Sequence, residues 1–100
     1  MKISKDMIRE PNMSMSLVLI PPHESIPAHY HTNCQTALYI IKGHGRVLTG
    51  LKLEKSLFFE AGDFIYIAPL DIHQPFNDSE ETMIAVVCRD ARYEITETLQ

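Results

Sequence analysis

The chain has no tryptophan, four glycines and two cysteines among its 100 residues, and each shortage excludes a class of protein. None of the glycines falls in a G-x-G-x-x-G or Walker spacing, which argues against a phosphate-binding loop. Two cysteines are too few for a disulfide-stabilised scaffold. No apolar run approaches the about 18 residues of a membrane-spanning helix, so we expect no membrane partner.

Positive charge is also scarce, because 9 lysines and arginines face 13 aspartates and glutamates for a net charge of −4. Nucleic acids and anionic membranes are bound by clustered positive charge, so we expect neither as a partner. Residues 1–12 are charged and lack the apolar run of a signal peptide. We therefore expect a cytoplasmic location, with Cys34 and Cys88 as reduced thiols.

Short apolar stretches make up most of the chain, whose hydrophobic content of 45% is typical of a globular protein. Its length fits a single domain over residues 1–100. Apolar residues follow a period of two or form short runs bounded by proline, glycine and turn residues, which favours strands. We expect strands at 15–20, 26–32, 36–42, 46–49, 51–60, 64–68, 73–76 and 82–88, and helices at most at 6–10 or in the last few residues. The pattern predicts an all-β sandwich or barrel.

Histidine is unusually frequent, with five residues, and two of them are nearly adjacent. His29 and His31 are spaced i and i+2 on a predicted strand, which projects both imidazoles from the same face, about 6–7 Å apart. A third imidazole, His73, follows another predicted strand and joins the pair only if the chain folds back. Three convergent imidazoles could bind one divalent transition metal. Iron, manganese, nickel, zinc and copper all accept this ligand, so the sequence leaves the metal open.

The histidine spacing resembles that of the cupins, whose two motifs are written G(X)5HXH(X)3-4E(X)6G and G(X)5PXG(X)2H(X)3N. The first motif falls on residues 23–43 and the second on residues 62–77. The matching anchors are His29, His31, Gly43, Gly62, His73 and Asn77. The resemblance implies a small single-domain cupin, a double-stranded β-helix or jelly-roll barrel of six to eight antiparallel strands, with residues 1–12 as an N-terminal arm. It also implies a metal at His29, His31 and His73.

Four positions depart from the motifs. His23 stands at the first glycine of the first motif, and Ala68 and Leu70 replace the proline and the second glycine of the second motif. Thr36 stands in the place of the glutamate ligand, where a neutral hydroxyl is a much weaker donor than a carboxylate. The expected site is therefore three histidines with open positions for water or ligand.

Several neighbours are predicted to border the pocket or support the histidines. Thr36 should face the two imidazoles, and Gln35 could supply a carbonyl oxygen, although strand alternation directs it to the opposite face. Asn77 resembles the asparagine of the second motif, for which holding a turn by hydrogen bonds is the expected role. Asp71 is a candidate catalytic residue, as a general base or as an acceptor for a hydrogen bond from a metal-binding histidine, with a solvated loop carboxylate as the alternative. No residue indicates an organic cofactor.

Three classes of function remain open at this stage. The resemblance allows a metal-dependent enzyme of the dioxygenase, isomerase, epimerase or decarboxylase type acting on a small molecule. The alternatives are a non-catalytic module that binds or senses a small ligand and a domain that associates with a partner protein. Because the site lacks a carboxylate, it keeps the full charge of the metal, which favours an anionic ligand. We also expect a homodimer, with residues 13–20 pairing across a two-fold axis and the arm lying on the neighbour.

Overall fold

The computed structural model describes residues 13–91 and 95–98, and all the regular structure in these ranges is β-strand. The strands are β1 (Ser14–Ile20), β2 (His29–His31), β3 (Thr36–Lys42), β4 (His44–Thr49), β5 (Lys55–Glu60), β6 (Phe64–Ile67), β7 (His73–Asn77), β8 (Met83–Arg89) and β9 (Thr96–Thr98). The predicted all-β fold is confirmed. The prediction of a helix near the C-terminus is wrong for residues 96–98, which form β9, and residues 6–10 lie outside the described ranges. None of the described segments is a helix able to cross a membrane.

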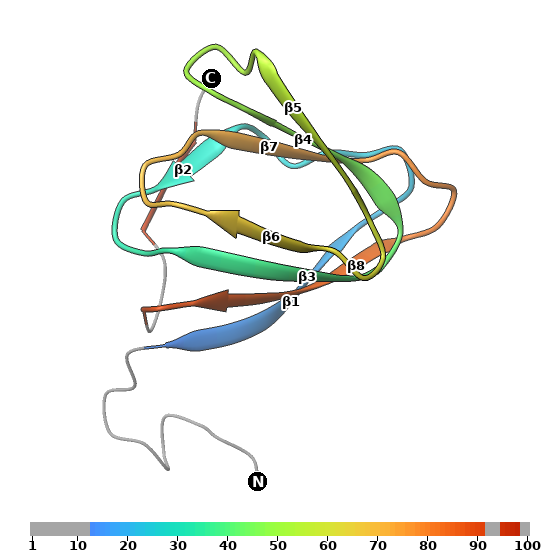
Figure 1. Ribbon diagram of the computed structural model, residues 1–100, viewed down its shortest axis with the longest axis horizontal. Helices are drawn as coiled ribbons and strands as arrows, with labels where there is room; N and C mark the ends of the chain where they lie inside the picture. The colour runs from blue at the N-terminus through green and yellow to red at the C-terminus, as the bar shows by residue number, and fades with distance from the viewer. Residues whose placement is uncertain (1–12, 92–94, 99–100) are drawn as a thin grey trace, which may run out of the picture.

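The strands form two antiparallel sheets that face each other (Figure 1). One sheet has the order β1-β8-β3-β6, and the other has the order β5-β4-β7-β2-β9. The chain passes back and forth between the sheets, and only β4 and β5 follow each other within one sheet. This alternation produces the jelly-roll barrel that the motifs imply. Nine strands are described, rather than six to eight, because β9 adds a short strand at one sheet edge, paired with β2.

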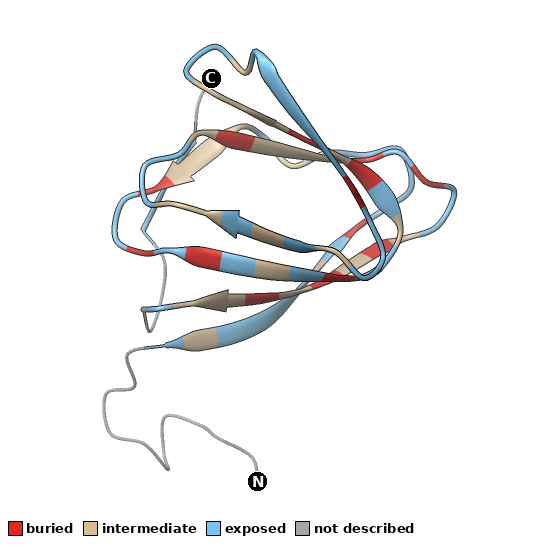
Figure 2. Ribbon diagram, in the orientation of Figure 1, coloured by how far each residue is buried: buried red, intermediate tan, exposed pale blue. Residues whose placement is uncertain are grey.

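Buried and less buried residues follow each other along the strands (Figure 2), because successive side chains of a strand point to opposite faces of the sheet. On β8, Met83, Ala85 and Val87 are at most 2% exposed, whereas the residues between them are half-buried on the other face. Burial therefore alternates with a period of two along this strand, and both of its faces are apolar, which gives an uninterrupted apolar run in the sequence. The inner face forms the interior of the barrel.

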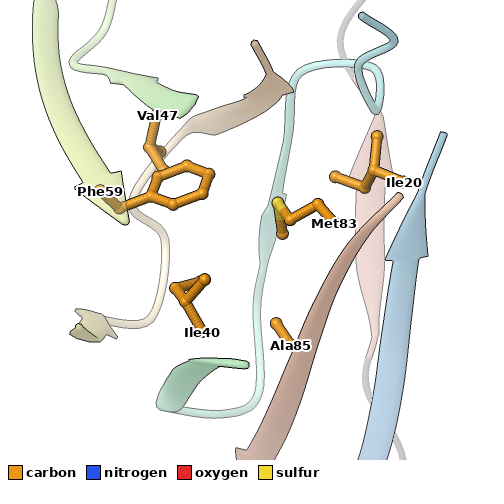
Figure 3. Packing of buried hydrophobic residues seen from close by; sticks show 6 residues of the cluster. All are labelled: Ile20, Ile40, Val47, Phe59, Met83 and Ala85. Carbon is orange, nitrogen blue, oxygen red and sulfur yellow. The ribbon is translucent and has the colours of Figure 1, made fainter. Parts of the chain in front are cut away.

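Six buried side chains from both sheets fill one part of that interior (Figure 3). They are Ile20, Ile40, Val47, Phe59, Met83 and Ala85. Each large apolar side chain buried in this way contributes about 1.5–3 kcal/mol to folding. The cluster fixes the distance between the two sheets.

Gly43 carries the chain from β3 in one sheet to β4 in the other. Its φ of +97° is a conformation that side-chain-bearing residues rarely adopt. A Cβ atom at this position would also lie 3.1 Å from the Cα atom of Met83. The final glycine of the first motif is thus required by both the backbone conformation and the close approach of the core.

Candidate metal centre

Three imidazoles meet inside the barrel. His29 and His31 come from β2, and His73 comes from β7, where it is the direct partner of His29 in the antiparallel register. The ring centroids are 5.0 Å apart for His29 and His31, 4.2 Å for His29 and His73, and 5.1 Å for His31 and His73. One nitrogen from each ring lies within 4.8 Å of the others. The donor atoms are close enough for one metal ion to contact all three.

Hydrogen bonds at Nδ1 set the orientation of the three rings. Nδ1 of His29 lies 2.7 Å from the carbonyl oxygen of Pro27, and Nδ1 of His73 lies 2.9 Å from the carbonyl oxygen of Asp71. A carbonyl only accepts, so both nitrogens must donate, and the metal-binding lone pair of each ring is at Nε2. Nδ1 of His31 lies 3.0 Å from Oγ1 of Thr96 on β9. This is the arrangement that metal-binding histidines have in proteins.

The protonation state of His73 also favours metal binding. The pKa of its imidazole is lowered from 6.5 to about 4, mainly by burial and also by the neighbouring His29 and His31, although the hydrogen bond to Asp71 and the charge of Asp71 oppose the shift. The ring is therefore neutral near pH 7. A neutral imidazole is the form that binds a metal ion.

The loop between β6 and β7 supports two of the histidines with its backbone. The amide of Leu70 donates to the carbonyl of His31 at 2.8 Å, and the next residue, Asp71, supplies the carbonyl that binds His73. Leu70 occupies the place of a motif glycine and keeps a left-handed backbone with φ of +70°. His23, which stands at the first glycine of the first motif, has a φ of +60°. The glycine conformations are thus retained although the glycines are not.

Thr36 faces the same cavity as the three histidines, as the sequence predicts. It begins β3 and is only 3% exposed. Its Oγ1 atom is buried and has no hydrogen-bond partner within residues 13–91 and 95–98. A buried hydroxyl without a partner costs about 1–3 kcal/mol of stability. This hydroxyl is available for a hydrogen bond with a ligand in the cavity. The register of β3 places it where the family motif has its carboxylate.

Arg89 is a cavity residue that the sequence reasoning missed. It is the last residue of β8 and lies directly opposite Thr36 in the antiparallel register with β3. The signal was available, because Arg89 has the same parity as Met83, Ala85 and Val87, and strand alternation therefore directs it inward. The predicted strand ends at residue 88 and therefore leaves the arginine outside it.

The rest of the cavity wall is apolar. The space measures about 590 Å³ when its open mouth is included. Among the described residues, its polar lining consists of the three histidines, Thr36 and Arg89. The apolar lining is Val18, Ile20, Ile26, Leu38, Ile40, Val47, Phe59, Ile65, Ile67, Pro75, Met83 and Val87. No carboxylate from the described residues reaches this cavity.

Three other residues singled out from the sequence lie outside the cavity lining, namely Gln35, Asp71 and Asn77. Gln35 is exposed, and it donates to both carboxylate oxygens of Asp90 and accepts a hydrogen bond from Tyr66. The contacts with Asp90 and Tyr66 hold the Gln35 side chain outside the cavity lining. Asp71 is exposed and contributes its backbone carbonyl to His73.

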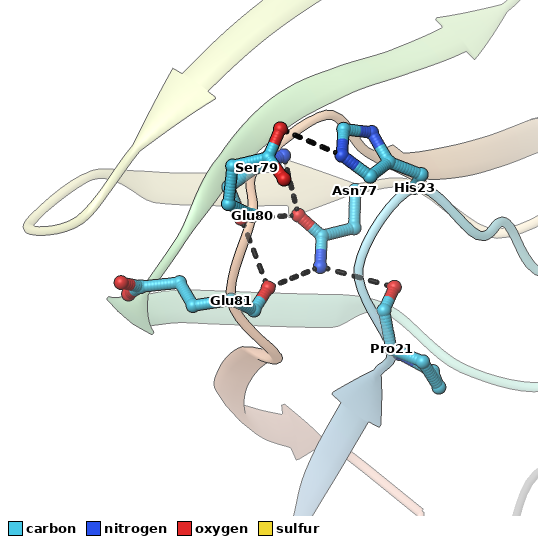
Figure 4. A network of polar contacts seen from close by, with 6 residues as sticks. All are labelled: Pro21, His23, Asn77, Ser79, Glu80 and Glu81. Atoms are coloured by element: carbon cyan, nitrogen blue, oxygen red, sulfur yellow. Dashed lines mark hydrogen bonds and ion pairs between the residues drawn. The ribbon is translucent and has the colours of Figure 1, made fainter.

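Asn77 fastens a turn rather than lining the pocket (Figure 4). It is 1% exposed, and its amide nitrogen lies within 3.1 Å of the carbonyls of Ile20, Pro21 and Glu81. Its side-chain oxygen accepts hydrogen bonds from the backbone and the hydroxyl of Ser79. These contacts tie the β7–β8 turn to the end of β1. The asparagine therefore positions the sheets and not the ligand.

Comparison with known proteins places this geometry in a family. The sequence model of a family described as cupin domain matches residues 16–88, and no curated protein matches the chain. Among solved structures, an uncharacterized conserved protein with a double-stranded beta-helix domain from Klebsiella pneumoniae has a TM-score of 0.79 at 19% identity, over 93% of this chain and 80% of that chain. An oxalate oxidase in complex with the substrate analogue glycolate has a TM-score of 0.78 at 22% identity, over 88% and 46% of the two chains. A formate complex of Lactobacillus farciminis oxalate decarboxylase has a TM-score of 0.79 at 22% identity, over 88% and 27%.

The chain spans less than half the length of either oxalate enzyme. At these identities the likeness to solved structures establishes a shared fold. The family match extends over most of the chain and contains His29, His31 and His73. With its two facing sheets and its histidine cluster, this chain belongs to the cupin domain family.

Proposed function

We propose that the protein binds one divalent transition metal ion through His29, His31 and His73 and uses the cavity beside it for a small anionic molecule. The observation that carries this proposal is the orientation of the rings, in which Nδ1 of each histidine is engaged and the donor nitrogens converge within 4.8 Å. Iron, manganese, nickel, zinc and copper all suit three imidazoles. A bound metal supplies a Lewis acid at this end of the barrel.

Binding without turnover is the function that the cavity supports best. General acid–base catalysis needs a protonatable group beside the ligand, and no carboxylate of the described residues lines the cavity. Metal-dependent catalysis is the second candidate. Three protein ligands leave open positions on the metal, which is the pattern of catalytic rather than structural sites.

Metal analysis of the purified protein tests the proposal. We expect about one equivalent of transition metal in the wild type and a higher melting temperature with metal than without it, because a ligand of the native state stabilises that state. His31→Ala should lose the metal. His44→Ala removes an exposed histidine outside the cavity lining and should retain it. A stoichiometric metal in His31→Ala would refute the site. Product analysis of the metal-loaded protein incubated with small carboxylates then separates binding from catalysis.

A second copy of the chain is the proposed protein partner, and it would cover the outer face of the β1-β8-β3-β6 sheet. That face is apolar across all four strands. Its exposed side chains, which we call the apolar outer face, are Met15, Leu17, Leu19, Tyr39, Ile41, Phe64 and Tyr66. They range from 40% exposed for Tyr39 to 82% for Phe64. β1 is also the edge strand of this sheet, with one side open to pairing.

The area of the apolar outer face supports a dimer. Its three aromatic side chains can bury about 150–250 Å² each, and together with the four aliphatic ones the face presents on the order of 800 Å², which is what one partner buries in a stable interface. Patches on monomeric proteins measure only about 300–600 Å². The predicted contact of the N-terminal arm with the neighbour lies outside the described residues.

A cytoplasmic location is proposed on the chemistry of the thiols. Neither Cys34 nor Cys88 is part of a disulfide, and Cys34 is buried. Free thiols persist in a reducing compartment.

A further inference from the structure

The cavity changes character along its length. Facing residues of β3 and β8 form three successive pairs in the antiparallel register, namely Thr36 with Arg89, Leu38 with Val87, and Ile40 with Ala85. All of these except Ala85 line the cavity. The wall therefore runs from a polar and charged pair at one end to purely aliphatic pairs at the other. The same cavity is also lined by the three histidines, which are its other polar residues in the described part of the chain.

The polar end suits a carboxylate. Arg89 brings a permanent positive charge and a planar fork of donors that matches the two oxygens of a carboxylate. Directly across the strand pair, Thr36 adds a buried hydroxyl whose Oγ1 has no hydrogen-bond partner among the described residues. Residues directly opposite each other in antiparallel strands have Cβ atoms about 4.5–5.5 Å apart, so one head group can contact both.

The aliphatic end selects against ligands that are polar throughout. A sugar would bury hydroxyl groups against Leu38, Ile40 and Val87, which offer no hydrogen bonds. Each such unpaired group is costly. A small dianion with a carboxylate at each end would bury its second carboxylate against the same aliphatic side chains. An unbranched or aromatic hydrocarbon gains from it instead.

We propose that the natural ligand is a monocarboxylate with an apolar tail, whose head group is bound by Arg89 and Thr36 beside the metal and whose tail lies against Leu38 and Ile40. This inference rests on the proposed function, because it names the ligand class of the same cavity. It adds two recognition residues and a direction for the ligand within the barrel.

Calorimetric titration of the metal-loaded protein with hexanoate, acetate and hexanamide tests the proposal. We expect hexanoate to bind more tightly than acetate by about fourfold for each additional methylene group that is buried. Hexanamide has the same tail without the charge and should bind about 10- to 100-fold more weakly than hexanoate. The ligand series examines the tail without changing the protein.

Variants examine the head group. Arg89→Gln should weaken hexanoate about 10- to 100-fold while the metal content stays unchanged, and Arg89→Lys should fall between the two because it keeps the charge and loses the fork. Lys42→Gln removes one exposed positive charge at the other end of β3 and should bind hexanoate like the wild type. Melting curves confirm that each variant is folded.

The possible results separate the two proposals. Equal affinity for acetate and hexanoate, or unchanged hexanoate affinity in both Arg89 variants, overturns the inference even when the metal is bound at equimolar ratio. A wild-type protein that takes up no transition metal overturns the proposed metal site instead. Carboxylate binding by the metal-free protein through Arg89 then still supports the assignment of the head-group residues.

Discussion

The Thr36 hydroxyl should reduce the stability of the protein, and replacing it with a methyl group in Thr36→Val should raise the melting temperature. Thr36 is 3% exposed and its Oγ1 has no hydrogen-bond partner in the part of the chain that the structure describes, so folding removes the hydroxyl from water without compensation. Valine has nearly the same shape and suits a strand at least as well. The substitution therefore removes the polar atom and leaves the packing in place.

The size of the effect follows from the cost of an unpartnered buried group. That cost is about 1–3 kcal/mol, and water entering the cavity recovers part of it, so we expect a gain of about 1 kcal/mol. For a domain of this length, 1 kcal/mol corresponds to about 4–8 °C in the melting temperature. The same variant should bind hexanoate more weakly, because it loses one head-group contact.

Thr49→Val provides the matched control. Thr49 is half-buried on β4, and its hydroxyl donates to the carbonyl of Ile72 at 2.9 Å. Removing this satisfied donor should lower the free energy of unfolding by about 1 kcal/mol. Calorimetry and urea denaturation at one fixed protein concentration measure both variants. If Thr36→Val is destabilised like Thr49→Val, the Thr36 hydroxyl has a partner in solution and its role as an unused ligand contact is refuted.

Further predictions concern charge, pH and association. Thr36→Glu should tighten metal binding about 10- to 100-fold and weaken carboxylate binding, because a carboxylate facing the histidines attracts the cation; Gln35→Glu adds the same charge on the other side of β3 and should change neither. His73 has a pKa of 6.5 in the unfolded chain and of about 4 in the folded metal-free chain. The metal-free protein should therefore have its full stability above pH 6.5 and lose stability as the pH drops toward 4. A denaturation midpoint that does not change between pH 7 and 4.5, or the same pH dependence in His73→Gln, would contradict this. Sedimentation at micromolar concentration should give twice the monomer mass for the wild type and for Leu51→Lys, and the monomer mass for Leu17→Lys; a monomeric wild type rules out the dimer.

The architecture and the histidine cluster could be predicted from the sequence, because both depend on short-range patterns. Period-two alternation placed His29 and His31 on one face of a strand, and the motif spacing connected them to His73. Both features survive in the structure because alternation is a property of any strand. The partner of each Nδ1 atom was not predictable, since it depends on the path of backbone carbonyls and on β9, which the sequence did not reveal as a strand.

Arg89 shows where the sequence reasoning stopped too early. A strand boundary placed one residue short removed the only charged side chain of the inner face of β8 from consideration. Strand ends are uncertain in sequence patterns because fraying and turn residues blur them. The left-handed backbone at Leu70 was also missed, since an exposed leucine gives no local sign of a positive φ.

The hydrogen bonds from His29 and His73 to main-chain carbonyls have a consequence for how this protein can change in evolution. A side-chain acceptor is lost by one substitution, whereas the carbonyl of residue 27 or 71 is present whatever amino acid stands there. The orientation of two metal-binding rings is thereby buffered against mutation of their partners. The ligand contacts at Thr36 and Arg89 have no such protection, because each consists of a side chain. Metal retention and ligand choice can therefore diverge independently, so that this barrel can be redirected to a new small molecule without losing the ion.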